Sequence, residues 1–205
     1  HNYVQKYCEK LAKKDKRIKY KKLIENKGIS DNTNECINMA TGNYIALFDH
    51  DDILEHTVLF EYMIAICDKD ADFIYCDEDK FNEFGGELYD ENYKPDFAVD
   101  NLRSNNYICH FTVFDRELLK ECGVFRKQFD GSQDHDLILR LTEKAKNVVH
   151  IPKVLYHWRV SAASVASDPY AKPYTINAGI QAVKEHLNRV GLSGTVESTV
   201  MHPNI

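Results

Sequence analysis

The sequence of 205 residues predicts an α/β fold. Apolar runs of strand length, such as residues 44–48 and 72–77, alternate with stretches whose apolar residues recur at helical spacing, such as 57–68. Strands that alternate with helices in this way are typical of a sheet covered by helices. The first run ends abruptly in three carboxylates, and ligands of open α/β sheets bind where strands end. The pattern therefore predicts both the fold class and the edge that carries a site.

The first part of the chain predicts three helices and three strands. The helix from Asn2 has an apolar face, and the second helix is capped by Ser30 or Asp31 and ended by residues 41–43. In order, the expected elements are helix 2–13, strand 17–23, helix 30–40, strand 44–48, helix 57–68 and strand 72–77.

The second part begins with a polar segment, residues 78–104, which is too long for a routine connector. Segments of this kind are usually functional or mobile, so we expect a loop with a functional part rather than a plain connector. The elements expected after it are strand 107–114, helix 116–122, helix 136–145, strands 148–151 and 154–158, and helix 173–190, which Gly191 closes.

The composition excludes several classes of protein. Hydrophobic residues make up 43% and charged residues 28% of the chain, as in soluble globular proteins. The net charge of −6 argues against a general nucleic-acid binder, and no apolar stretch reaches the length of a membrane span. The amino end is no signal peptide. Six scattered cysteines without a C-x-x-C pair favour a reducing compartment over a disulfide framework.

The carboxylates after the strand 44–48 are Asp49, Asp51 and Asp52. Each pair repels by roughly 4 kcal/mol at 4 Å and an effective dielectric constant of 20, and a bound cation relieves this cost. Oxygen ligands suit Mg²⁺ or Mn²⁺, and Mg²⁺ usually shares its shell with substrate phosphates. The pattern therefore favours a metal-diphosphate site, with a solvated acidic turn as the alternative.

Three further segments carry candidate residues. Gly28, Ser30 and Asn34 surround a helix start that could face an anion, although a plain capped turn explains them as well. The acids of residues 130–136 open a helix, where a carboxylate would stay ionised and could act as a general base. In residues 155–159, a neutral imidazole could complete a metal shell and a guanidinium could meet phosphate, although a lone histidine is more often structural.

Taken in order, these segments resemble the inverting GT-A glycosyltransferases of family 2. Residues 26–34 and 40–52 carry the general likeness. Residues 75–80, 94–96, 106–110, 129–137 and 151–159 resemble the bacterial surface-polysaccharide branch, which includes rhamnan and O-antigen synthesis enzymes. The resemblance covers nearly the whole chain, and the ordered set is far more specific than any one motif. It implies a three-layer GT-A sandwich with a mixed, mostly parallel sheet.

The resemblance also implies roles for individual residues. Asp49-His50-Asp51 matches the D-x-D motif, in which Asp51 ligates the metal on the donor diphosphate and Asp49 contacts the metal or ribose, with Asp52 beside them. Asp134 matches the catalytic base, preceded by Gln133 where the family usually has Glu. The residues with an implied part in donor or metal binding are Gly28, Ser30, Asn34, Arg159 and His157, while Asp77 and Asp79 lie where donor-sugar or acceptor contacts are expected.

The implied reaction is a single displacement with inversion. Asp134 takes a proton from an acceptor hydroxyl, and Mg²⁺ or Mn²⁺ stabilises the departing nucleoside diphosphate. The expected partners are a nucleotide-diphosphate sugar and a glycan or lipid-linked glycan, without nucleic acid and without a membrane span in this chain. The expected location is the cytoplasm, with peripheral association of the parent protein at the inner face of the plasma membrane as a second expectation.

The family's first strand and acidic nucleotide-gripping loop should precede His1. We therefore expect a fragment whose transferase domain spans residues 1–192, followed by a linker or a new domain over 193–205, and whose activity as given is in doubt.

Two other functions stay open on the sequence alone. A transferase-like module without turnover would bind glycan or a partner chain. A haloacid-dehalogenase-like phosphatase also ends a strand in D-x-D, although Ile53 stands where that family has Thr or Val. An EF-hand is excluded, because Leu54 occupies the position that needs a sharp-turn glycine.

Overall fold

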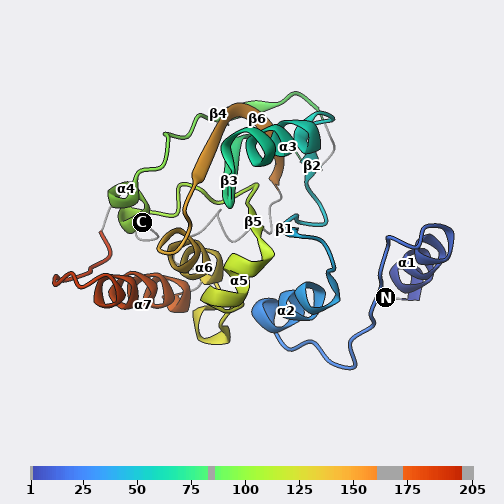
Figure 1. Ribbon diagram of the computed structural model, residues 1–205. Helices are drawn as coiled ribbons and strands as arrows, with labels where there is room; N and C mark the ends of the chain where they lie inside the picture. The colour runs from blue at the N-terminus through green and yellow to red at the C-terminus, as the bar shows by residue number, and fades with distance from the viewer. Residues whose placement is uncertain (1, 83–85, 161–172, 200–205) are drawn as a thin grey trace.

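The computed structural model describes residues 2–82, 86–160 and 173–199 (Figure 1). Six strands form one sheet in the order β1-β5-β3-β6-β2, with β4 paired to β3. The strands are β1 (Tyr44–Ala46), β2 (Ile53–Leu54), β3 (Phe73–Asn82), β4 (Tyr89–Asn92), β5 (Val113–Asp115) and β6 (Val148–Val160). The helices are α1 (Asn2–Lys14), α2 (Ile29–Met39), α3 (Val58–Lys69), α4 (Val99–Ser104), α5 (Arg116–Cys122), α6 (Gln133–Thr142) and α7 (Pro173–Arg189), with a 3₁₀ turn η1 (Lys127–Phe129).

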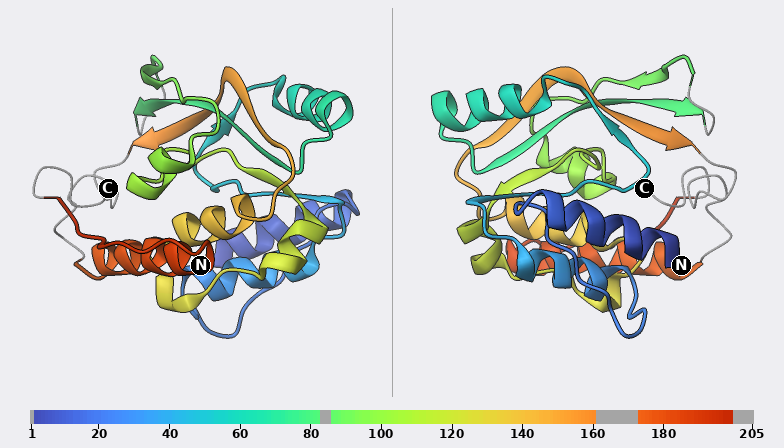
Figure 2. Two further views of the ribbon diagram at one scale, coloured as in Figure 1. Left: turned by 60° about the vertical axis from the view of Figure 1, so that its left-hand side comes forward. Right: turned by 90° about the vertical axis from the view of Figure 1, so that its right-hand side faces the viewer.

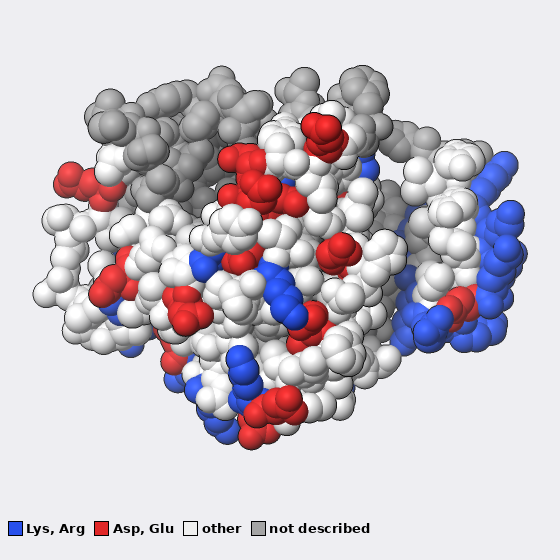
Figure 3. Space-filling model, turned by 90° about the horizontal axis from the view of Figure 1, so that it is seen from above, with Lys and Arg blue, Asp and Glu red and all other residues white. Residues whose placement is uncertain are grey.

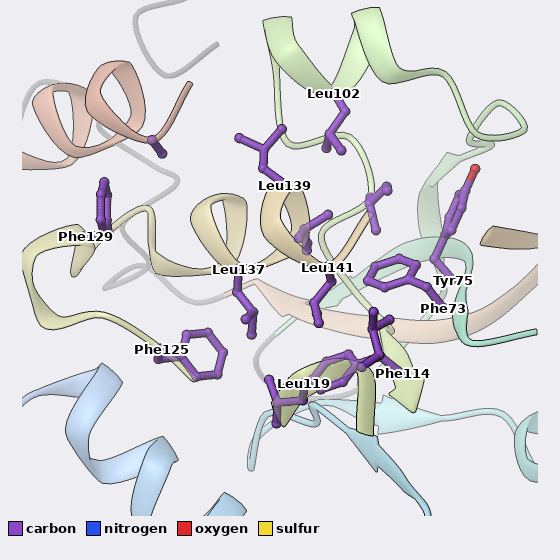
Figure 4. Close-up of a cluster of buried hydrophobic side chains, with 14 of the residues drawn as sticks. Phe73, Tyr75, Leu102, Phe114, Leu119, Phe125, Phe129, Leu137, Leu139 and Leu141 are labelled. Atoms are coloured by element: carbon purple, nitrogen blue, oxygen red, sulfur yellow. The ribbon is translucent and has the colours of Figure 1, made fainter. Parts of the chain in front are cut away.

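Helices cover both faces of the sheet, as the three-layer prediction requires (Figures 1 and 2). Strand β3 explains why, because its alternate side chains enter two separate cores. Phe73 and Tyr75 pack with α5, α6 and α7 on one face (Figure 4), whereas Ile74 and Cys76 pack with α3 on the other. The predicted α/β class and the layered sandwich are confirmed.

The sheet is mixed, as predicted, but the prediction that most of its strands are parallel is wrong. Among the described strands, only the long β3–β6 pair is parallel, and the other four pairs are antiparallel. Strand β4 follows β3 closely in the chain, and short connections join antiparallel neighbours, whereas parallel neighbours need a long crossover.

The helices predicted from periodicity are found with ends shifted by a few residues at most. The strand predicted over 17–23 is wrong, because that stretch is irregular and leaves Ile18 exposed. The predicted loop over 78–104 is also wrong in part. It contains the end of β3, the strand β4 and the helix α4, while residues 83–85 lie outside the described residues.

Two strands predicted after α6 are one long bent strand, β6, whose register against β3 shifts beside Cys76 and Asp77. Strands β1 and β5 are shorter than predicted, ending at Ala46 and beginning at Val113. Residues 47–52, which follow β1 and carry the predicted acids, therefore lie outside regular secondary structure. Of the expected linker 193–205, residues 200–205 lie outside the described part of the chain.

The remaining sequence expectations concern charge, cysteines and membranes. All six cysteines are free thiols in the structure. No helix within the described residues has the length and apolar character needed to cross a bilayer. Although the net charge is negative, Lys and Arg side chains gather at the α1 end of the face shown in Figure 3.

Candidate active site

An exposed turn carries the acids that follow β1. The Asp52 N–H donates to the Asp49 carbonyl at 3.4 Å, which closes the turn before β2 begins. The side chains of Asp49 and Asp51 keep 65% and 50% of their surface accessible. Two carboxylates at the end of a strand are therefore open to a ligand.

Asp52 is buried and holds this turn against β6. Its Oδ1 accepts the backbone N–H of Arg159 at 2.7 Å, and its Oδ2 accepts the hydroxyl of Tyr156. The Arg159 side chain adds a bond from Nε to the Asp51 carbonyl at 2.6 Å. Burial raises the pKa of Asp52, and the bonds from Arg159 and Tyr156 oppose that rise. Asp52 and Arg159 thus position the exposed acids, and their own contact with a donor stays a prediction.

His157 lies on β6, where it is paired with Ile53 of the neighbouring strand β2. Its Nδ1 is 2.6 Å from Asp79 Oδ1, and both side chains are buried. A carboxylate on one ring nitrogen orients the other toward a ligand, as it does for many metal-binding histidines. The structure thus places His157 and Asp79 beside the acidic turn, where metal binding by His157 stays a prediction.

The donor set suits a cation that is shared with a diphosphate. Within residues 2–82, 86–160 and 173–199, no three His, Cys, Asp or Glu side chains gather closely enough to hold an ion by themselves. A Mg²⁺ ion usually needs only one or two protein carboxylates, because substrate phosphates and water complete its shell. The open carboxylates of Asp49 and Asp51 fit that requirement.

His110 is a central residue to which the sequence assigned no role. Its Nε2 lies 3.7 Å from Asp49 Oδ2 and its Nδ1 lies 3.7 Å from Glu78 Oε2. The ring stacks on Tyr156 at 5.0 Å between centroids. Burial would lower the pKa of His110, but contacts with Cys109 and Glu78 outweigh it and raise this pKa to about 12. Two carboxylates therefore face His110 beside the acidic turn, and both favour its protonated form.

A buried lysine fixes the loop that presents His110. The Lys94 side chain is fully buried, and its Nζ donates to Glu78 Oε2 at 3.1 Å, to the Ile108 carbonyl at 2.7 Å and to the His110 carbonyl. All three ammonium protons thus have acceptors. The motif Lys94-Pro95-Asp96 was the available signal, but its partners are too distant in sequence to be predicted.

Asp134 is the second residue of α6, and Gln133 orients it. The Gly131 N–H donates to Gln133 Oε1 at 2.7 Å, and Gln133 Nε2 donates to Asp134 Oδ2 at 3.0 Å. Burial raises the pKa of Asp134 to about 6. The charge of Asp49 adds to this rise, whereas His110 and the hydrogen bond from Gln133 lower the pKa. The sequence left the role of this glutamine in doubt, and the structure gives it a bond to the candidate base.

The substitution Gln133→Glu is expected to shift the acid limb of the pH–rate profile upward. It replaces an N–H donor by a second carboxylate beside Asp134, and a like charge raises a carboxyl pKa. A base that titrates higher loses activity at a higher pH as the solution is acidified. The measurement is kcat/KM against pH for both proteins, and an unchanged or lowered limb would contradict the account.

Asp49, His110 and Asp134 line one cavity of about 530 Å³. The acidic turn, His110 and the candidate base therefore meet at one cavity. Along the chain, Asp49 and His110 are 61 positions apart, and His110 and Asp134 are 24 positions apart. Asp51 lies on the same turn but is not among the described residues that line the cavity. The wall opposite comes from α2 and β1, and includes Ile29, Asn32, Thr33, Cys36, Ile37, Tyr44 and Ile45.

The three predicted residues at the start of α2 have partners within the chain. Asn34 exchanges two hydrogen bonds with the Phe125 backbone, at 2.9 and 3.0 Å. The Ser30 hydroxyl and N–H donate to Asp130. Gly28 has a φ of 101°, and a Cβ there would lie 2.8 Å from Asp130 Oδ2. These contacts dock α2 onto the segment before α6, and a part in donor binding stays a prediction.

Comparisons of the sequence and of the fold both find similarity to glycosyltransferases. The model of glycosyl transferase family 2 matches residues 2–123. The O-antigen biosynthesis protein RfbC of Myxococcus xanthus is 32% identical over 197 residues, covering 96% of this chain and 15% of that protein. The chain spans 21% and 15% of the length of the first two curated relatives it matches.

Two solved structures have the same fold. TarS 1–349 of S. aureus in complex with UDP-GlcNAc has a TM-score of 0.66 at 15% identity, covering 87% of this chain and 54% of that one. The mannosyltransferase PcManGT of Pyrobaculum calidifontis in complex with GDP-Man and Mn²⁺ has a TM-score of 0.58 at 14% identity, covering 96% and 53%. None of these matches supports a phosphatase or a module that only binds.

Proposed function

The chain belongs to glycosyl transferase family 2, and from this premise we propose that it transfers a sugar from a nucleotide-diphosphate donor to a glycan acceptor, with inversion, in bacterial surface-polysaccharide synthesis. The GT-A fold supports this proposal. The observation that supports it most is that Asp49, the proposed donor-binding carboxylate, and Asp134, the proposed base, line the same cavity.

In the proposed reaction, Asp134 accepts the proton of the attacking acceptor hydroxyl. With a pKa of about 6, this carboxyl is ionised at neutral pH and still basic enough to share a proton in the transition state. Gln133 holds it in place through one hydrogen bond. Attack from the face opposite the departing diphosphate inverts the anomeric carbon.

The donor diphosphate is proposed to lie in the cavity that Asp49 and His110 both line. Asp49 and Asp51 would hold a Mg²⁺ or Mn²⁺ ion, which supplies Lewis-acid stabilisation of the departing diphosphate when bound. His110 lines the same cavity and could donate a ring N–H to an anionic group there. The acceptor is proposed to be a glycan or lipid-linked glycan, met at the inner face of the plasma membrane.

A thermal-shift panel of nucleoside diphosphates with Mn²⁺ tests the donor side. We expect one nucleotide to raise the unfolding midpoint by roughly 5 to 10 °C at a concentration one hundred times its Kd, and a chelator to abolish the shift. Asp51→Ala should lose the shift, whereas the exposed Asp68→Asn on α3 should keep it. A shift that survives both chelation and Asp51→Ala would overturn the donor-site proposal.

A further inference from the structure

A second cavity, of about 640 Å³, lies on the other side of Asp134. It is within the size range of small-molecule sites. Among the described residues, only Cys109 and Asp134 line both cavities. Asp134 thus lies on the wall between the two cavities, with the proposed donor site on one side and the second cavity on the other.

One wall of this second cavity is an apolar stripe on α7. Ile176, Ile180, Val183 and Leu187 recur at helical spacing and all line it. Ile176, Ile180 and Leu187 are half-buried, so each offers uncovered apolar surface. Polar groups line another part, where Arg103 and Ser104 end α4 and Asn106 follows it. The cavity thus pairs an apolar wall with hydrogen-bonding groups.

Close packing fixes this wall relative to Asp134. The Ser132 hydroxyl donates to the Thr175 carbonyl at 2.8 Å, which ties the start of α6 to the first turn of α7. Gly131 has a φ of 95°, and a Cβ there would lie 2.4 Å from Thr175 Cγ2, so only glycine permits the approach. The apolar stripe therefore has a defined distance to the candidate base.

We propose that the second cavity is the acceptor subsite and that it selects a sugar with a methyl-ended substituent, such as a 6-deoxyhexose or an N-acetylhexosamine. The inference rests on the proposed function. The methyl group packs on Ile176 and Ile180, and a hydroxyl of the same ring points to Asp134. The hydroxyl oxygen bonds to the donor's anomeric carbon, its proton passes to Asp134, and the bond to the diphosphate breaks with its electron pair leaving on the diphosphate.

Matched pairs of glycosides test this selectivity. Methyl α-L-fucoside is compared with methyl α-L-galactoside, and methyl N-acetyl-β-D-glucosaminide with methyl β-D-glucoside, by titration and saturation-transfer NMR. Both are run with and without nucleoside diphosphate and Mn²⁺. We expect the fucoside and the N-acetylglucosaminide, which carry the additional methyl group, to bind at least about fourfold tighter than their partners. A fourfold difference is about 0.8 kcal/mol, the value of one buried methyl group. Its methyl protons should receive the strongest saturation.

The substitutions Ile180→Thr and Ile176→Thr should each reduce this preference, and having two such variants guards against one that fails to fold. Asn177→Thr, at an exposed position of the same helix, should leave it unchanged. Equal affinity within the pairs, no binding by any member, or a preference that survives both substitutions would overturn the inference. Nucleotide binding that depends on Mn²⁺ is measured separately, so its loss marks failure of the proposed function instead.

Discussion

Replacing Asp134 by asparagine is expected to slow sugar transfer by roughly 100- to 10,000-fold, the range of general-base catalysis. Asparagine keeps the shape of the side chain but cannot accept the acceptor's proton. The nucleotide should still bind, because the residues proposed to hold it lie on the turn after β1. The measurement is release of nucleoside diphosphate from the nucleotide sugar selected by the thermal-shift panel, with saturating acceptor.

The control for this prediction is Asp68→Asn, an equal change of charge at an exposed position on α3. The unsubstituted protein should also lose activity about tenfold per pH unit below about pH 6, because Asp134 must be ionised to act. An Asp134→Asn protein that binds nucleotide and keeps near-normal turnover would show that this carboxylate is not the base.

Replacing Lys94 by methionine is expected to lower the free energy of unfolding by about 3 to 5 kcal/mol, the cost of removing one partner of a buried ion pair. The change leaves the Glu78 carboxylate and the carbonyls of Ile108 and His110 without their buried donor. Burial alone would raise the pKa of Glu78, and it is Lys94 and His110 that keep it low. The measurement is urea unfolding with a two-state fit.

Two further variants isolate this cause. Lys94→Met combined with Glu78→Gln should recover part of the lost stability, because the unpaired charge is removed. Lys120→Met, which breaks the exposed pair with Glu117, should cost no more than about 1 kcal/mol. If Lys94→Met costs as little as Lys120→Met, the buried network does not hold the loop as described.

The sequence predicted helices better than strands, for a physical reason. Helices α3 and α7 show their apolar face within the segment itself, so periodicity suffices. Strand β3 continues through Asp77, Glu78 and Asp79, which look like loop residues but are buried against His150, Lys94 and His157. Residues 17–23 alternate like a strand yet form none in the described structure. Strand formation depends on distant partners, which a single sequence does not display.

The same limit applies to the site. Asp49, Asp51 and Asp134 could be proposed from the sequence because they stand in short motifs with a recognisable order. The role of His110 was missed, because it depends on contacts with Glu78, Asp49 and Tyr156, which are distant in the sequence. The second cavity was also missed, since α7 showed only the periodicity of an ordinary helix.

The most direct test of the central idea is an anomalous diffraction map from crystals grown with Mn²⁺ and the nucleoside diphosphate that stabilises the protein. We expect one manganese peak at the carboxylates of Asp49 and Asp51, with the diphosphate in the cavity that Asp134 lines. A manganese peak and nucleotide bound elsewhere on the molecule would contradict the account.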